Sequence, residues 1–167
     1  MRPPADGKPD ATLSKAGITA QKLRHLELLF VSPWSVRVGP EREVPIAAEV
    51  DLFVPNPTSF IIQKLLIHAD RPPRKQAQDL LYIHDTLELF GGSLDELRRL
   101  WFEDVRPAMP PRTAKRPEVI ARERFAEVTD TIREAARIPQ DRRLAPADVQ
   151  RACEFGLGEI LQAQRPA

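Results

Sequence analysis

The chain has 167 residues, of which 42% are hydrophobic and 29% are charged, and its formal net charge is +1. This composition is typical of a soluble globular protein of about one domain. So small a net charge predicts no binding to nucleic acid or to an acidic partner through the overall field of the molecule. Cys153 is the only cysteine, which excludes an internal disulfide and a cysteine-rich metal site and favours a reducing, cytoplasmic location. No apolar run approaches the roughly 20 residues that a membrane-spanning helix needs.

The first third of the chain predicts a tail followed by a small antiparallel sheet. Residues 1–14 are polar, contain prolines and lack periodicity, so we expect a flexible tail. Residues 26–30 alternate as in a strand, residues 34–38 predict a short second strand, and residues 44–54 contain the clearest strand. Two or three strands are too few to be stable alone, so we expect helices to pack on them.

The middle of the chain predicts two helices joined by a tight turn. Pro57 favours the first helical position, with Asn56 as the N-cap. Consecutive prolines at positions 72 and 73 cannot continue that helix, and a second helix is predicted over residues 74–90. Leu81 lies on the apolar face of the second helix, and we expect it to be buried between the hairpin and the sheet.

The rest of the chain also predicts helices. Ser93 and Glu96 have the spacing of a capping box, which predicts a third helix ending near residue 105. A fourth helix is predicted over residues 118–138 and a fifth over residues 146–162. The predicted fold class is therefore α+β, with a small antiparallel sheet of two to three strands followed by about five helices.

A compact set of charged residues surrounds the turn between the first two helices. Lys64 interrupts an otherwise apolar helix, and Asp79 precedes two leucines in the next. Their order and spacing resemble the minimal nucleotidyltransferase superfamily, in particular proteins with a V-P-x-P-x-x-(F/Y)-x-x-x-K-L segment followed by R…K-x-x-x-D-L. The abortive-infection type of toxin nucleotidyltransferase has a comparable lysine helix and aspartate-leucine helix. The matching positions, within a resemblance that covers roughly residues 17–90, are Val54-Pro55-Asn56-Pro57, Phe60, Lys64-Leu65, Arg71, Lys75 and Asp79-Leu80.

The resemblance implies transfer of a nucleotide from an NTP, with Mg²⁺ or Mn²⁺ held by carboxylates. The superfamily supplies two acids from a Gly-Ser turn followed by D-x-D, and a third from a nearby strand. The only superficial match is Gly92-Ser93…Asp95, which we interpret as a helix cap. We therefore expect the paired acids to be missing with the N-terminal part of such a fold, so that the chain is a fragment of an enzyme or a natural non-catalytic remnant.

The candidate third acid implied by the resemblance is Glu27 or Asp51. The alternative for both is a solvent-facing position on a strand. Neither acid alone would hold a divalent ion tightly, because such ions want several oxygen ligands.

The candidate phosphate- or nucleotide-binding residues are Lys64, Arg71, Lys75 and Asp79. Lys64 either contacts a triphosphate or the acid cluster, or lies at the edge of the core with its ammonium group in solvent. Asp79 either orients Lys64 or a nucleotide hydroxyl, or pairs with Lys75 one helical turn away. The first expectation for Asp79 is a structural role in anchoring the hairpin.

Other reactive side chains favour structural roles. His84 lies on an apolar helix face, which predicts a satisfied buried histidine. Cys153 has no neighbouring histidine in the sequence, so we expect a small apolar residue. The basic stretch over residues 106–116 could touch RNA, DNA or a phosphate, but short basic linkers are more often only solvated. Nucleic acid is therefore a weak expectation as a partner.

These observations predict four regions. Residues 1–14 form the tail, residues 15–105 a truncated nucleotidyltransferase-like domain, residues 106–117 a linker rich in proline and arginine, and residues 118–167 a C-terminal helical region. We expect the chain to be the C-terminal half of a nucleotidyltransferase fold that does not catalyse alone. The alternative is a non-enzymatic interaction module that binds a protein partner, such as an antitoxin-like protein, or the missing N-terminal half.

Overall fold

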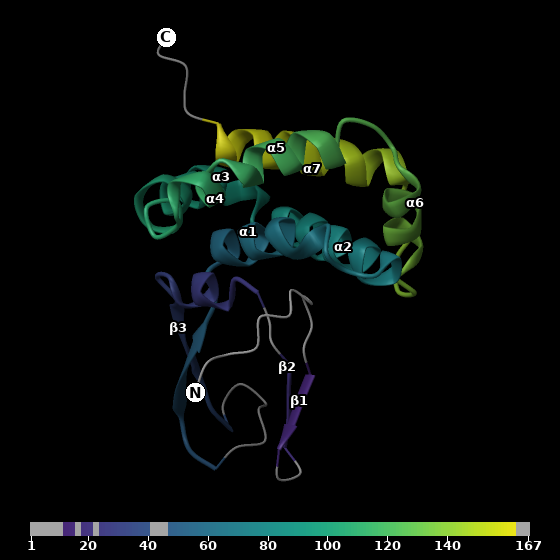
Figure 1. Ribbon diagram of the computed structural model, residues 1–167. Helices are drawn as coiled ribbons and strands as arrows, with labels where there is room; N and C mark the ends of the chain where they lie inside the picture. The colour runs from purple at the N-terminus through teal and green to yellow at the C-terminus, as the bar shows by residue number, and fades with distance from the viewer. Residues whose placement is uncertain (1–11, 16–17, 22–23, 41–46, 163–167) are drawn as a thin grey trace.

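The computed structural model describes residues 12–15, 18–21, 24–40 and 47–162 (Figure 1). The predicted tail over residues 1–14 lies mostly outside these ranges, although a strand begins at Thr12. The helices form two layers, with α1 and α2 in one layer, α3, α5 and α7 in the other, and α6 across one end. The strands extend from the opposite side of the α1–α2 layer. Small antiparallel sheets with a helical body confirm the α+β class.

Two antiparallel strand pairs precede the helices. Strand β1 (Thr12–Lys15) pairs with β2 (Ile18–Gln21), and β3 (Trp34–Val38) pairs with β4 (Val50–Val54). The strands predicted at residues 34–38 and at the end of residues 44–54 are thus confirmed. In the β3–β4 register the opposed pairs that share one face are all apolar: Trp34–Val54, Val36–Leu52 and Val38–Val50.

The strand predicted over residues 26–30 is wrong, because Leu26–Phe30 forms a 3-10 helix, η1. His25 and Ser32 on either side adopt positive φ angles of 56° and 44°, which turn the chain sharply at both ends. Leu28 is buried in the core, whereas Phe30 is 76% exposed. Five residues of apparent alternation cannot separate a strand from a short helix that buries one leucine.

Helix α1 (Pro57–His68) begins as predicted, because Asn56 Oδ1 accepts a hydrogen bond of 2.8 Å from the Ser59 backbone N–H. The Asn56 amide also donates to the Val31 carbonyl oxygen at 2.8 Å and to that of Ser32 at 3.1 Å. The cap therefore also ties the start of α1 to the chain that follows η1.

Helix α2 (Pro73–Leu89) follows the predicted proline turn. Contacts between the two helices pair Phe60 with Tyr82 and Lys64 with Asp79, so that positions further along α1 meet positions earlier in α2. The hairpin is therefore antiparallel, as its short connection requires.

The predicted capping box at Ser93 does not form. Residues Gly91–Ser93 make a 3-10 turn, η3, in which the Ser93 backbone N–H donates to the Phe90 carbonyl oxygen at 2.8 Å. That donor is no longer free for Glu96, and the Ser93 side chain makes no capping hydrogen bond. Helix α3 (Leu94–Leu100) continues directly into a π-helical turn, η4 (Trp101–Val105), so the predicted end near residue 105 is confirmed.

The helix predicted over residues 118–138 is two helices, α5 (Arg116–Arg124) and α6 (Asp130–Arg137). Phe125 ends α5 and is fully buried, and Thr129 caps α6 by accepting from the Ile132 N–H at 3.3 Å. The break lets α5 pack against α1 and α6 pack against α2, while both helices contact α7. Helix α7 (Pro146–Leu161) agrees with the predicted fifth helix, and a short helix α4 (Pro111–Ala114) lies in the predicted linker.

One hydrophobic core joins the hairpin to the C-terminal helices. Its buried side chains come from every major helix, including Ile61 of α1, Leu80 of α2, Leu97 of α3, Ile132 of α6 and Leu157 of α7. Helix α2 packs against α1, α6 and α7. In the described part of the chain, no helix is long and apolar enough to cross a membrane.

Candidate functional site

The centre of the charged cluster is a buried carboxylate on α2. The Asp79 side chain is only 1% exposed, yet it has a cation on each oxygen. Lys64 Nζ of α1 lies 3.3 Å from Oδ1, and Arg71 Nε of the interhelical turn lies 3.2 Å from Oδ2. The hairpin thus brings together three of the residues that the sequence singled out, and Asp79 joins the two helices and the turn between them.

Lys64 is held between two aromatic rings. Its ammonium group lies 5.2 Å from the ring centre of Phe60 and 5.4 Å from that of Tyr82, within range for cation–π attraction. Its side chain is 14% exposed, and its ammonium group lies against Asp79. Sequence reasoning missed Tyr82, whose spacing three residues after Asp79 places both on one face of α2.

Burial and charge act in opposite directions on Asp79. Burial raises the pKa of the Asp79 carboxyl, and the positive charges of Lys64 and Arg71 oppose that rise. Within the described residues, neither Asp79 Oδ2 nor Arg71 Nε makes a hydrogen bond of good geometry, although the two atoms form an ion pair. A carboxylate oxygen and a guanidinium nitrogen are therefore buried with unused hydrogen-bonding capacity.

Lys75 lies on the outer side of the cluster. Its Nζ donates to Gln78 Oε1 at 3.0 Å, and the Gln78 amide donates to the Tyr82 hydroxyl at 2.6 Å. Asp79 pairs with Lys64 and Arg71 in place of Lys75, so the alternative of a simple one-turn pair is not what the structure shows. Lys75 is exposed and contributes positive charge beside the buried cluster.

Glu27 and Asp51 lie on other elements and have other partners. Glu27, in η1, is 73% exposed and lies 3.6 Å from His25 Nδ1. Asp51, in β4, is 52% exposed and accepts a 3.0 Å hydrogen bond from Arg37 Nε of β3. In the described ranges, neither acid makes an ion pair with Lys64.

The donor set does not fit a divalent metal ion in the part of the chain that the structure describes. No group of three or more His, Cys, Asp or Glu side chains is placed to hold one. Asp79 is already paired with two cations, which compete with a metal for its oxygens. A Mg²⁺ or Mn²⁺ ion wants several oxygen ligands.

Three other reactive side chains, His84, Cys153 and His68, are buried in the core. His84 is 2% exposed, with Nδ1 3.1 Å from Asp85 Oδ1 and Nε2 3.8 Å from Glu88 Oε1, as a satisfied buried histidine. Burial raises the pKa of the Cys153 thiol, which makes it unreactive. His68, at the end of α1, was not singled out by the sequence. Burial, with a smaller effect of Arg124, lowers its pKa to about 4.

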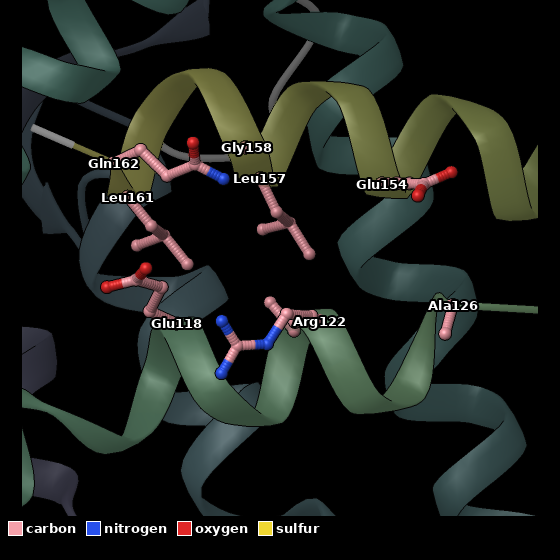
Figure 2. A pocket seen from close by; sticks show the side chains of 9 residues that line it. Glu118, Arg122, Ala126, Glu154, Leu157, Gly158, Leu161 and Gln162 are labelled. Carbon is pink, nitrogen blue, oxygen red and sulfur yellow. The ribbon is translucent and has the colours of Figure 1, made fainter. Parts of the chain in front are cut away.

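A separate groove of about 320 Å³ lies between α5 and α7 (Figure 2). Leu157 and Leu161 of α7 point into it, and Glu118 and Arg122 of α5 lie across from them. No residue of the Lys64–Asp79 cluster lines this groove. Its mixed charges and apolar floor give no set of converging cations for a polyphosphate, so the cluster on the hairpin is the better candidate site.

Comparison with known proteins identifies a family. The family model described as "Nucleotidyltransferase" matches residues 1–105, which contain the strands, the α1–α2 hairpin and the helix that ends with η4. No curated protein and no solved structure matches. The match ends at Val105, so α4 to α7 lie outside it although they share the core.

Proposed function

Since the chain belongs to the nucleotidyltransferase family, we propose that its hairpin binds the phosphates of an NTP and that the chain alone does not transfer the nucleotide. The observation that carries this proposal is the pairing of Lys64 with the buried Asp79 between two aromatic rings. Such an arrangement fixes the direction of the lysine side chain, and a preorganised cation suits polyphosphate recognition. The proposal assigns the fold's lysine-helix part to this chain and leaves the paired acids to another polypeptide segment.

Each residue of the cluster has a distinct role in this proposal. Asp79 positions Lys64, because its Oδ1 lies 3.3 Å from the Lys64 ammonium nitrogen and fixes the direction of the side chain. The aromatic rings limit the motion of the lysine chain. Arg71 and the exposed Lys75 add positive charge at the rim, where phosphate oxygens would arrive from solvent.

Metal-dependent transfer is not assigned to the described residues, because their donors do not fit the ion. In relatives that hold the paired acids, a divalent ion would polarise the phosphates and the attacking hydroxyl. Here, Lys64 and Arg71 would only bind and orient the nucleotide. We expect weak NTP binding that is strongly salt-sensitive where the cations are exposed.

The binding test compares Lys64→Ala with a matched control, Arg137→Ala. Lys64→Ala should weaken binding of a fluorescent NTP analogue about 10-fold or more, because it removes a charge-assisted contact. Arg137 is exposed at the end of α6, and its replacement should leave binding unchanged. Equal binding by wild type and Lys64→Ala would contradict the assignment of the site.

The activity test incubates the chain with Mg²⁺ or Mn²⁺ and each labelled NTP, with cell RNA and protein as acceptors. We expect no transfer of label. Transfer that disappears in Lys64→Ala would falsify the non-catalytic reading and would mean that acids such as Glu27 or Asp51 complete the site.

A second candidate function is favoured by the β3–β4 hairpin. One face of this hairpin is apolar throughout, and Val36, Val50 and Leu52 on it are 38%, 46% and 47% exposed. An exposed apolar face favours packing against a protein partner, and a two-stranded sheet is only marginally stable without such packing. In this reading the chain is an interaction module whose partner is a segment that carries the paired acids or an antitoxin-like protein, and the relationship to abortive-infection toxins belongs to the same proposal.

Leu52→Ser with Val36→Thr tests this candidate. Coexpression with a segment that carries Gly-Ser…D-x-D should give a complex with the wild type and none with the double variant. A complex formed equally well by both proteins would contradict binding through this face.

A further inference from the structure

A second, independent concentration of positive charge lies where η4 leads into α4 and α5. Residues 106–116 contain four cations, Arg106, Arg112, Lys115 and Arg116, and no acid. The whole chain has a net charge of only +1, so this positive charge is local. All four side chains are exposed, and among the described ion pairs none involves them. Their charges are therefore free to meet a ligand.

Two of these cations, Arg106 and Lys115, line a hollow that also has an aromatic side. The hollow has a volume of about 430 Å³, and its lining includes Phe102, Arg106, Met109 and Lys115. The Arg106 guanidinium carbon lies 5.4 Å from the centre of the Phe102 ring, which places a planar cation over an aromatic ring. A flat ligand group can stack on such a surface.

The local backbone holds this surface in place. The Arg106 N–H donates to the Trp101 carbonyl oxygen at 2.9 Å, the i to i+5 bond of a π-helical turn. π-helical turns are rare and are frequent at functional sites. Two of the prolines in this stretch, Pro107 and Pro111, line the hollow and restrict the chain around it. A surface already ordered loses less entropy on binding.

We infer that this hollow is a docking site for single-stranded nucleic acid. A base stacks beside Phe102 and Arg106, and the neighbouring phosphates contact Arg112, Lys115 and Arg116. Cations distributed along a segment beside an aromatic ring suit a strand that presents repeated phosphates and flat bases. An acidic peptide matches the charge but leaves the aromatic surface unused. The inference does not depend on nucleotide binding at Lys64.

The first test measures the salt dependence of binding to a fluorescent 12-nucleotide oligouridylate and to its DNA counterpart. Binding should be on the order of 10 µM at physiological salt, as for sequence-independent contacts. Three phosphate contacts predict a slope of log K against log salt of about −2, since each contact on a single strand contributes about −0.7. Arg112→Ala with Lys115→Ala should reduce the steepness of that slope by about 1.4.

The matched control is Arg137→Ala with Arg143→Ala, which removes two exposed arginines of other segments. This control should keep the wild-type slope. If both double variants lost the same amount of salt-slope steepness, the effect would depend on the net charge of the protein and not on this site. That result would overturn the inference.

The second test separates stacking from charge. Arg106→Lys keeps the charge and removes the planar group, so affinity should fall about 5-fold with no change in the salt slope. Phe102→Leu should also lower the affinity about 5-fold without changing the salt slope. Thermal melts of both variants show whether the fold is intact. Unchanged affinity in both, or tighter binding of a 12-residue polyglutamate peptide than of either oligonucleotide, would overturn the inference. NTP binding measured on the same proteins tests the Lys64 site separately.

Discussion

At the scale of single residues, Asp79 is the side chain on which most of the charged cluster depends. It is nearly inaccessible to solvent and is compensated by Lys64 and Arg71. Burying a charge is costly, and removing one member of a buried pair leaves the others uncompensated. The same residues therefore serve stability and, in our proposal, nucleotide binding, so the two effects have to be measured separately.

A double-mutant cycle measures this coupling. Asp79→Ala should lower the free energy of unfolding by about 3 to 5 kcal/mol, because two cations lose their buried partner. Lys64→Met should cost less, since Arg71 still pairs with Asp79. The double variant should be more stable than the sum of the single losses predicts, by about 0.5–3 kcal/mol. Urea unfolding of the four proteins provides the values, and strict additivity would show that Lys64 and Asp79 do not interact.

His68 should make stability depend on pH. Burial lowers its pKa from 6.5 to about 4, so below pH 6.5 the unfolded chain binds a proton that the folded chain does not. Stability should therefore fall as the pH is lowered from 6.5 to about 4 and level off below, with a total loss of about 3 kcal/mol from this residue. His68→Leu should lack this component. Parallel slopes for both proteins in melts over this pH range would contradict the burial of a neutral imidazole.

At the scale of elements, α2 is surrounded by other helices. Leu81 is 5% exposed, as the sequence predicted, but among the described elements the main partners of α2 are α1, α6 and α7, which are helices and not the predicted sheet. Leu81→Ala should lower the free energy of unfolding by about 2–5 kcal/mol, the range for large-to-small changes in a core. Leu89→Ala is the matched control, because Leu89 on the same helix is 76% exposed. Similar losses in both variants would place Leu81 at the surface.

Helix α7 contains two glycines with different surroundings. A Cβ at Gly156 would lie 2.9 Å from Leu87 Cδ2 of α2, whereas a Cβ at Gly158 would meet nothing closer than 3.8 Å. Gly158→Ala should raise stability by about 0.5–1 kcal/mol through helix propensity. Gly156→Ala should instead lower the free energy of unfolding by about 1 kcal/mol or more, because the added methyl group overpacks α2 against α7. Thermal melts that rank Gly156→Ala above Gly158→Ala would contradict the close approach of these helices.

At the scale of the whole molecule, the hydrophobic core extends further along the chain than the family match does. The match ends at residue 105, but Phe125, Ile132 and Leu157 from beyond it are buried with the hairpin leucines. We therefore expect residues 118–162 to fold together with the hairpin in one cooperative transition. Thermal unfolding followed by circular dichroism and by tryptophan fluorescence, which reports on Trp34 and Trp101, should give one midpoint. Two separate midpoints would mean that the C-terminal helices form an independent domain.

Local chemistry in the sequence determined much of this fold. Pro57 after Asn56, the proline pair at 72 and 73, and the apolar period of α1, α2 and α7 act over a few residues, so their outcome could be predicted. The order of Lys64, Arg71 and Asp79 likewise indicated the family and the charged cluster, since residues on a short helical hairpin have few ways to meet.

Only the tertiary structure decided the elements that depend on distant partners. Residues 26–30 became a 3-10 helix because Leu28 packs into the core beside α1, and the Ser93 N–H went to Phe90 in place of Glu96. The helix expected over 118–138 breaks at Phe125, whose carbonyl oxygen accepts a 2.6 Å hydrogen bond from the Gln150 amide of α7. The sequence named Lys64 and Asp79 as candidates, but the aromatic rings around Lys64 and the burial of Asp79 required both helices to be in place. Contacts between residues far apart in the chain form only when the whole core packs around them. A pattern over a few neighbouring residues therefore cannot predict them.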